Sequence, residues 1–599
     1  MCGFLGFIGK HEEKTRKRFL SAFEIIDHRG PDNSNTFESD KYLLGHKRLA
    51  IIDLDDRSNQ PFTKENNFLL YNGEIYNYKS LRNKLKENFG CVFETEGDTE
   101  VLFFGLMHKG IEFLQEIDGM FSLCFISNNG QVLLARDRFG QKPLFYGFKN
   151  DESLVFGSEL QAIIKLVGNE ALEVNEEAFS EYFQYGASIA PKTMFKSLKQ
   201  VVAGEAVTIS LEKKSNYSEC WDKTQLFPEI KTALKDALTD RLKSCFVADT
   251  DVAILSSGGI DSSALIKTMP YVFRTTSAVA VHLKTKEDEK GLGIAKELEA
   301  ANLPLLVFDS KSIFNADSSQ YISMLLNRFG EPFADTSYFY SEELYSTIPD
   351  KYKVVIGGDG ADEMFMGYRP RPYFYLASLV TKIIPVCIRR KLIDVVLDYG
   401  RLGLLFAVLL GCKDSSEKVL MGFSTKDLKE INLNSISDVK IERRLLISGN
   451  EITDFYANYL MTRLKNVFMK KSDHASMRFS KELRSPYLQG NKTVFPAMGN
   501  VFSNIVPKLK LKLYMLNSIG LLKIFRKKVG FEVISENNEK NRQSTIIDWC
   551  KKNKSLIDTY FIYDRFMSLI KNTSKDRYLF RIEVFIKWLE WAHSNYERK

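Results

Sequence analysis

The rhythm of the apolar segments changes near residue 220, and this change most constrains how the chain can fold. Before it, short apolar or alternating segments recur, among them KYLLGHKRLAIIDL, FSLCFIS and QVLLARD, with turn residues such as Asn128-Asn129-Gly130 between them. Segments as short as these favour stacked antiparallel sheets. After it, buried strands alternate with helices, a pattern typical of a parallel α/β sheet. The sequence therefore predicts two successive domains of different class.

Individual elements follow from the hydrophobic periodicity. The apolar run 403–411 is far shorter than the roughly 18 residues that span a bilayer, so it predicts a buried helix and no membrane span. Beyond residue 368 the chain is predicted to be mostly helical. The other expected elements are helices at 80–89, 99–109 and 227–246, and strands at 251–255, 277–283, 303–309 and 353–357.

Cysteine usage and charge narrow the class of protein. The eight cysteines are scattered, with no CxxC pair and no Cys/His metal spacing, which predicts free thiols in a reducing cytoplasm. A net charge of +7 is weak evidence for nucleic acid or membrane binding at a length of 599 residues. The stretch 463–531 is locally basic, with 15 Lys and Arg against Asp473 and Glu482. It could bind phosphate groups or form a solvated face, and the charge pattern alone favours neither.

Cys2 is a candidate nucleophile. A small residue at position 2 permits removal of the initiator methionine, which would leave Cys2 with a free α-amine. That amine has a pKa near 8, so it can accept the proton of the adjacent thiol without a histidine partner. The alternative is that Cys2 is a small buried residue, as many cysteines are.

The residues around Cys2 favour the nucleophile. The run CGFLGFIG is followed, in order, by the motifs HRGPD (28–32), GHKRL (45–49), YNGEIYN (71–77) and EGDTE (96–100). Over residues 1–210 this pattern resembles the class II, N-terminal-nucleophile glutamine amidotransferase domain. The resemblance implies an αββα sandwich in which Cys2 attacks the glutamine amide and releases ammonia. Asn72 and the Gly73 N–H would stabilise the oxyanion, while Arg48 would bind the α-carboxylate of glutamine and Asn72, Glu74 and Asp98 would complete its site.

A glycine-rich turn follows the strand predicted at 251–255. The sequence SSGGIDSS (256–263) lets the backbone approach a phosphate closely, and the helix after it offers free N–H groups. An aspartate beside a phosphate site commonly serves Mg²⁺. An ordinary strand-to-helix turn is the alternative, but the motif resembles the pyrophosphate-binding loop of the ATP pyrophosphatases and lacks the GK[ST] ending of a Walker A loop. The ATP-binding residues that the resemblance implies are Leu255, Ser257, Gly258, Gly259, Asp261, Ser262, Ser263 and Gly358.

A second glycine-rich element, GGDGADE (357–363), follows the strand at 353–357. With EPFADTS (331–337), KSDHASM (471–477), ELRSPYL (482–488) and KVGF (528–531), it makes the chain resemble the glutamine-hydrolysing asparagine synthetases. The resemblance implies ATP and Mg²⁺ as cofactors, with Asp261 and Asp362 as metal ligands, Asp359 as an acid near the attacking ammonia and Lys528 on the reacting phosphate. The basic stretch would surround the nucleotide, with most of its lysines still in solvent.

The implied organisation and reaction can be stated as expectations. We expect a glutaminase domain at 1–212, a linker at 213–227, an α/β ATP-pyrophosphatase-type domain at 228–535 and a helical C-terminal extension at 536–599. A carboxylate would be adenylated by ATP and then amidated by ammonia from glutamine. Aspartate is the favoured acceptor. A uronic acid of a surface polysaccharide is the alternative, because Gly357 replaces the usual serine and the region 375–455 has no clear counterpart in the family.

The sequence leaves two other functions to consider. The SGGxDS loop also occurs in tRNA-modifying thiolases, but the complete glutaminase half and the lack of paired cysteines near the loop argue against nucleic acid as a partner. A non-catalytic scaffold would hydrolyse no glutamine. The expected partners are therefore glutamine and a small carboxylate. The sequence leaves the oligomeric state open, a homodimer included.

Overall fold

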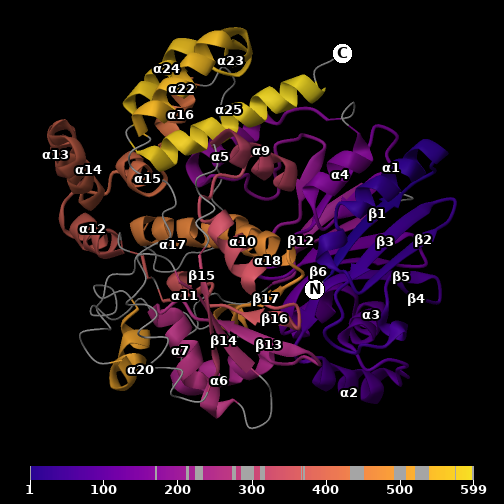
Figure 1. Cartoon of the computed structure of the whole chain (residues 1–599). Helices are drawn as coiled ribbons and strands as arrows, with labels where there is room; N and C mark the ends of the chain where they lie inside the picture. Colours follow the sequence, from indigo (N-terminus) through magenta and orange to yellow (C-terminus); the bar gives the residue numbers. More distant parts are fainter. Residues whose placement is uncertain are drawn as a thin grey trace.

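The computed structural model describes residues 2–168, 172–210, 215–222, 234–272, 278–284, 303–310, 318–365, 367–368, 371–431, 451–490, 508–519, 539–573 and 575–596. These residues form two sheet-containing regions and a large helical part (Figure 1). The N-terminal sheets lie on one side of the molecule, the parallel sheet lies beside them, and the C-terminal helices cross the top of the view (Figure 1).

Two stacked antiparallel sheets make up the first region, as predicted. In the described residues each has six strands. One sheet has the order β10 (Leu198–Gln200), β8 (Phe145–Phe148), β9 (Leu154–Gly157), β1 (Gly3–Ile8), β3 (Tyr42–Arg48), β2 (Asn33–Glu38). The other has the order β12 (Ser215–Cys220), β11 (Glu205–Ser210), β7 (Gln131–Arg136), β6 (Gly119–Ile126), β5 (Asn67–Ile75), β4 (Phe62–Lys64).

Alternating side chains explain this sandwich. Inward residues such as Phe4, Leu70 and Leu134 share one core between the sheets, because successive strand residues point to opposite faces. The helices α1 (Glu13–Glu24) and α4 (Leu160–Val167) cover the first sheet. The helices α2 (Tyr78–Phe89) and α3 (Asp98–Lys109) cover the second. The αββα layering is confirmed.

The predicted linker at 213–227 is partly wrong. Residues 215–220 form β12, which pairs with β11 at the edge of the second sheet. Trp221 is buried in the core of that sheet and stacks near Phe121, with ring centroids 5.6 Å apart. The polar composition of β12 reflects an edge strand whose side chains are all exposed, which explains why the sequence pattern missed it.

The second region is a parallel sheet with the order β15 (Leu305–Asp309), β14 (Ala278–Lys284), β13 (Asp251–Leu255), β16 (Tyr352–Ile356), β17 (Glu482–Arg484). The four predicted strands lie within two residues of their predicted bounds, while β17 was not predicted. Its three residues are too few to show a pattern. In β13, Val252 and Ile254 face one core while Ala253 faces another, as expected of a strand buried on both faces.

Helices cover both faces of this sheet. The helices α6 (Leu234–Cys245), α7 (Ile260–Thr268) and α20 (Leu509–Ile519) pack on one face. The helices α9 (Ser318–Phe329), α10 (Tyr338–Thr347) and α18 (Met469–Met477) contribute to the core on the other. The short α11 (Ala361–Met364) follows β16. For the helix expected at 227–246, residues 227–233 lie outside the described part of the chain.

The helical part confirms the prediction beyond residue 368. It contains α12 (Arg371–Ile383), α13 (Val386–Val396), α14 (Gly400–Leu409), α15 (Lys413–Met421), α16 (Thr425–Ile431), α17 (Glu451–Arg463), α22 (Glu539–Lys552), α23 (Lys554–Tyr560), α24 (Tyr563–Asn572) and α25 (Asp576–Tyr596). The prediction of a buried helix at 403–411 is confirmed only in part. In α14, Ala407 and Val408 are buried, whereas Phe406 is 55% exposed.

The predicted C-terminal extension is part of the main core. Arg581 of α25 donates to the carbonyls of Phe183 and Gln184 at the end of α5 (Phe179–Tyr185), at 2.5 and 2.9 Å, and Tyr182 donates back to the Arg581 carbonyl at 2.8 Å. Phe585 packs against this helix within the same core. The last helix therefore fastens the first region to the helical part.

Candidate active sites

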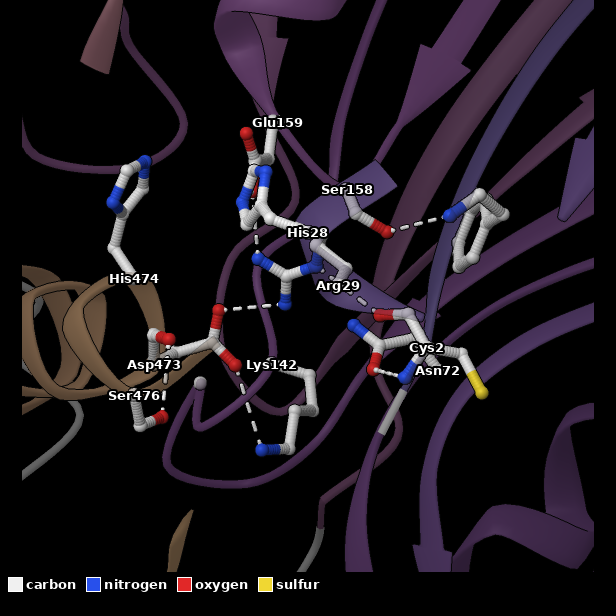
Figure 2. Close-up of polar contacts among 12 residues, drawn as sticks. Cys2, His28, Arg29, Asn72, Lys142, Ser158, Glu159, Asp473, His474 and Ser476 are labelled. Carbon is white, nitrogen blue, oxygen red and sulfur yellow. Dashed lines mark hydrogen bonds and ion pairs between the residues drawn. The ribbon is translucent and has the colours of Figure 1, made fainter. Parts of the chain in front are cut away.

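Cys2 and Asn72 bring the two N-terminal sheets together at one point. Cys2 immediately precedes β1, Asn72 lies on β5 of the facing sheet, and the Cys2 backbone N–H donates to Asn72 Oδ1 at 3.2 Å (Figure 2). The Asn72 side chain is fully buried, and its Nδ2 has no acceptor among the described residues. A buried amide N–H that has no acceptor and lies beside a thiol can donate to a developing oxyanion and so stabilise it.

The Cys2 thiol is buried, and polar groups lie close to it. Burial raises the pKa of the thiol, while the Leu49 backbone N–H and the Arg48 charge oppose this rise. A buried thiol needs a base close to it to become a nucleophile. The Cys2 nitrogen is such a base once it is a free amine.

Gly73 has a steric reason to be glycine. A Cβ at this position would lie 2.2 Å from the Met120 carbonyl oxygen and 2.7 Å from the Phe121 Cα of the paired strand β6. Any side chain would push β5 and β6 apart and move Asn72 away from Cys2. The predicted Asn72–Gly73 pair therefore depends on this close strand approach.

Arg48 is buried and holds the loop that follows β3. Its guanidinium donates to the Asp55 carbonyl at 2.9 Å, to Asn59 Oδ1 at 2.8 Å and to the Asp53 carbonyl. The role in binding the carboxylate of glutamine stays a prediction, since these contacts satisfy much of the guanidinium. They also place its positive charge beside Cys2.

Glu74 and Asp98 form a buried acidic pair. Glu74 accepts from Arg484 at 3.0 Å through one oxygen, and its Oε1 has no partner in the described structure. Asp98 accepts from the Tyr71 hydroxyl at 2.9 Å and from the Ile75 N–H at 3.0 Å. Burial raises the pKa of Asp98 to about 6, and burial followed by the charge of Asp98 raises the pKa of Glu74 well above its usual value. A bound ammonium group would relieve both carboxylates.

The predicted phosphate loop joins β13 to α7. Gly258 adopts φ +64°, a left-handed conformation that glycine accepts without strain. Ser257 and Ser262 share a hydrogen bond between their hydroxyls at 3.0 Å, and the Gly259 N–H donates to Ser257 Oγ at 3.3 Å. A Cβ on Gly358 would meet the Asp261 Cβ at 3.3 Å. The two glycine-rich turns thus pack together at the carboxyl ends of β13 and β16, where ligands bind in such sheets.

A cavity of about 290 Å³ opens at this edge of the sheet. Five of the eight predicted ATP-binding residues line it. The other three, Gly258, Gly259 and Ser263, belong to the same turn and to the start of α7. Its floor also carries Asp359, which accepts from the Ser472 hydroxyl at 2.9 Å. The five lining residues are Leu255, Ser257, Asp261, Ser262 and Gly358.

Asp261 and Asp362, the predicted metal ligands, converge on one cation. The Lys508 Nζ lies 2.7 and 2.6 Å from the two oxygens of Asp261 and 2.6 Å from Asp362 Oδ1. Two carboxylates that meet at one positive centre form a donor set suited to Mg²⁺. The described residues contain no group of three or more His, Cys, Asp or Glu side chains placed to hold a metal, so phosphate oxygens and water would have to complete such a site.

Sequence reasoning missed Lys508, Glu363 and Ser472. Lys508 belongs to the basic stretch but to no motif. Glu363 ends the GGDGADE motif, lines the cavity and accepts from Tyr368 at 2.5 Å. Burial raises its pKa to about 7, with a further contribution from Asp362. Glu363 and Ser472 could have been chosen from their motifs. The predicted catalytic residue Lys528 lies outside the described part of the chain.

A buried network around Arg29 reaches from Cys2 to α18 (Figure 2). Arg29 donates through Nε to the Cys2 carbonyl at 3.1 Å, through one terminal nitrogen to Glu159 at 2.9 Å and through the other to Asp473 at 2.8 Å. Lys142 Nζ lies 3.5 Å from the second oxygen of Asp473. Asp473 is on α18, next to the Ser472 that holds Asp359. One helix therefore touches the Cys2 backbone through Arg29 and the cavity through Ser472.

The basic stretch 463–531 is less exposed, in its described part, than the sequence predicts. Of its ten described lysines and arginines, only Arg478 and Lys510 are exposed. The others are buried or half-buried. Lys470 pairs with the buried Glu331, Arg484 with the buried Glu74 and Glu482, and Lys508 with the buried Asp261. Fewer of these cations face solvent than the sequence predicts.

All eight cysteines lie in the described part of the chain, and none of them forms a disulfide bond. In the part of the chain that the structure describes, no helix is long and apolar enough to cross a membrane.

Comparisons with known proteins match both halves of the chain. A glutamine amidotransferase domain family matches residues 1–221, and an asparagine synthase family matches residues 233–491. The chain is 28% identical to asparagine synthetase [glutamine-hydrolyzing] 1 of Bacillus subtilis, over 98% of this chain and 96% of that protein. It is 29% identical to a putative asparagine synthetase [glutamine-hydrolyzing] 2 of Methanocaldococcus jannaschii, over 64% of this chain and 78% of that protein. A glutamine phosphoribosylpyrophosphate amidotransferase from B. subtilis, a solved structure, is 15% identical, covering 60% of this chain and 82% of that one, with a TM-score of 0.29.

Proposed function

Because the chain belongs to the family of the glutamine-hydrolysing asparagine synthetases, we propose that it uses ATP to amidate aspartate with nitrogen from glutamine. The coarser activity follows from the family: the protein is a glutamine-dependent, asparagine-synthetase-like ligase. One observation carries the proposal: the chain contains two sites that contact the same helix. Cys2 and Asn72 form the first site, and the cavity with Asp261 and Asp362 forms the second. Helix α18 contacts the first through Arg29 and the second through Ser472.

In the first site, Cys2 would attack the side-chain amide of glutamine. Its own nitrogen, which already meets Asn72 Oδ1, would take the thiol proton once Met1 is removed. Asn72 Nδ2 and the Gly73 N–H would donate to the oxyanion, and the unpartnered Glu74 Oε1 together with Asp98 would hold the α-ammonium. The thiol leaves again when water hydrolyses the thioester, so the net products are glutamate and ammonia.

In the second site, the turn 256–263 would receive the phosphates of ATP at the start of α7. Asp261 and Asp362 would hold Mg²⁺, which when bound would neutralise the phosphate oxygens. Lys508 would then share its charge between these carboxylates and the nucleotide. Lys528 remains a predicted phosphate-stabilising residue. The substrate carboxylate would attack the α-phosphate, pyrophosphate would leave, and ammonia would displace AMP from the acyl adenylate to form the amide.

One cation that lines the cavity is placed to meet the acceptor carboxylate. Lys471, which donates to Ser337 at 3.0 Å, is the only lysine or arginine among the described residues that line the cavity, and it would face the acceptor carboxylate. A uronic acid is the second candidate, because Gly357 offers no hydroxyl at the cavity wall. For either acceptor we propose a cytoplasmic enzyme, and a homodimer, which light scattering in solution would test.

Pyrophosphate release measured in parallel with aspartate, glucuronate and galacturonate tests this proposal. We expect aspartate with glutamine to release pyrophosphate and to yield asparagine. Release with a uronic acid alone would replace the acceptor while keeping the ligase activity. No release with any carboxylate, together with intact glutamine hydrolysis, would contradict the adenylating role of the second site.

A further inference from the structure

Exposed apolar side chains gather on three successive helices. Of the 21 large hydrophobic residues that are exposed in the described structure, 12 lie between residues 373 and 406. We call α12, α13 and α14 (371–409) the apolar arm. In Figure 1 it lies along one edge of the molecule, on the side away from the N-terminal sheets. Scattered exposed apolar residues are normal, but a concentration of this kind marks an interaction site.

Each helix of the apolar arm presents an apolar face to solvent. On α12, Phe374 and Ala377 are buried while Tyr373, Leu376, Leu379 and Ile383 are exposed. No described residue of α13 is buried, and Ile388, Leu392 and Val395 follow one another at helical spacing on an exposed face. On α14, Leu402 and Phe406 are exposed one turn apart, while Ala407 and Val408 are buried. The helices are thus amphipathic with their apolar faces turned outward.

The apolar arm is held in place by its own contacts. Arg389 of α13 donates to the carbonyls of Ile384 and Leu410, each at 3.0 Å. Gly403 lets α14 cross close to α13, since a Cβ there would lie 1.7 Å from the Val396 carbonyl oxygen. Phe374 stacks on Tyr456 of α17 with ring centroids 4.8 Å apart. The exposed apolar faces therefore belong to helices that are held in place by the rest of the fold.

Charge indicates which partner this surface suits. Lys382, Arg390 and Lys391 are exposed beside the apolar residues, and Asp394 is the one acid seen exposed in the described part of the arm. A second copy docked by a twofold axis would bring two copies of this net positive surface together. An anionic lipid surface instead accepts the apolar side chains below its headgroups and pairs with the basic ones.

We propose that the apolar arm binds the surface of an anionic membrane, with Ile383, Leu392 and Leu402 entering the headgroup region and Lys382, Arg390 and Lys391 meeting lipid phosphates. The enzyme would then be a peripheral membrane protein without a spanning helix. This inference does not depend on which acceptor the active site uses. Binding through the apolar arm would hold the adenylating cavity of the same molecule close to the bilayer.

Flotation of the full chain with vesicles tests the proposal. We expect binding to vesicles of equal parts phosphatidylglycerol and phosphatidylcholine, weakened by salt, and little binding to phosphatidylcholine alone. Ile383→Asp should weaken binding at least about tenfold, the effect of keeping one large aliphatic side chain out of the apolar layer. Replacing Arg390 and Lys391 by glutamine should weaken it about fivefold for each charge.

Val92→Asp is the matched control, because Val92 is 75% exposed on the N-terminal domain and Ile383 is 78% exposed on the arm. Val92→Asp should leave binding unchanged, and both variants should keep glutamine hydrolysis. Equal loss in both variants, or no binding by the unaltered chain, would overturn the proposal. So would a lipid-free dimer in light scattering that Ile383→Asp converts to a monomer, since a second copy would then cover the arm.

The exposed thiol of Cys387 on α13 gives an independent readout. In a chain with Cys2, Cys220 and Cys412 replaced by serine, an environment-sensitive dye on Cys387 should shift to the blue on anionic vesicles. The same dye on Cys220, with Cys387 replaced instead, should not shift. An unshifted signal at Cys387 on vesicle-bound protein would show that another surface makes the contact.

Discussion

Arg29 and Asp473 form a fully buried ion pair, with 2.8 Å between the guanidinium and the carboxylate, across the boundary between the two catalytic halves (Figure 2). Arg29 also holds the Cys2 carbonyl, and Ser472, the residue before Asp473, holds Asp359. A displacement of α18 would therefore reach both sites. This arrangement offers a physical route by which the state of the cavity can influence the glutaminase.

Asp473→Asn should destabilise the protein and separate its two activities. The change leaves the Arg29 charge buried with one carboxylate partner, Glu159, which typically costs about 3–5 kcal/mol. We expect a lower urea midpoint and, in the folded fraction, more ammonia released for each amide formed. The ratio of glutamate to amide product measures this coupling.

Asp548→Asn is the control for this substitution. Asp548 pairs with Lys551 at 3.2 Å, and both side chains are exposed, so the pair contributes roughly 0–1 kcal/mol. It should leave the midpoint and the product ratio unchanged. A product ratio for Asp473→Asn equal to that of the unaltered enzyme would mean that the ion pair is structural only.

Much of the fold could be predicted, because the sequence patterns that indicate helices, strands and turns involve residues close together in the chain. The strand DVAIL and the turn after it need only the neighbouring residues, and β13 and α7 lie where expected. The edge strand β12 escaped because its exposed residues carry no alternation. The outward face of α14 escaped because a run such as GLLFAVLLG shows its hydrophobicity but not which neighbour covers it.

The candidate sites divide in the same way. Motif residues such as Asn72 and Asp261 could be chosen because each motif lies on one turn. Lys508 lies 247 positions beyond Asp261, and Arg29 lies 444 positions before Asp473. Pairs at such separations depend on how the elements pack, and a single sequence does not record that packing.

Asn72→Ala should affect only the glutamine half of the reaction. Loss of one oxyanion donor typically lowers kcat by about 10²–10³-fold, so glutamine hydrolysis should fall by that factor. Amide formation from added ammonium should continue at the rate of the unaltered enzyme. Cys2→Ala is the reference, since it should abolish glutamine hydrolysis and also spare the ammonia reaction. Parallel loss of both reactions in Asn72→Ala would place Asn72 outside the role proposed for it.

Lys508→Met should make the stability of the protein depend on Mg²⁺. Without the ammonium, the carboxylates of Asp261 and Asp362 repel each other, and the loss of a buried partner typically costs about 3–5 kcal/mol. Added Mg²⁺ should restore part of this loss in the variant and change the thermal midpoint of the unaltered apoenzyme less. Lys510→Met, at an exposed lysine two positions away, should show no such dependence. A midpoint of Lys508→Met that ignores Mg²⁺ would argue against a metal held by these two aspartates.

The affinity for glutamine should fall as the pH drops through about 6. Burial raises the pKa of Asp98 to about 6, so below this pH the carboxyl is protonated and no longer attracts the α-ammonium of glutamine. We expect the KM for glutamine to rise between pH 7 and pH 5 (around that pKa) while the ammonia-dependent rate keeps its own pH profile. Asp98→Asn should show a high KM with no such inflection.

The same shift predicts an effect on stability with the opposite direction in pH. The folded protein binds a proton at Asp98 more tightly than the unfolded chain, in which an aspartate has its ordinary pKa of 3.8. Between about pH 4 and pH 6 this site therefore lowers the free energy of unfolding as the pH rises, by about 1.4 kcal/mol for each unit of pKa difference. Asp98→Asn removes the titrating group, so the gain in stability of the variant over the unaltered protein should be larger at pH 8 than at pH 4. Urea unfolding at both pH values measures this difference, and a gain that is equal at the two pH values would mean that folding does not raise the pKa of Asp98.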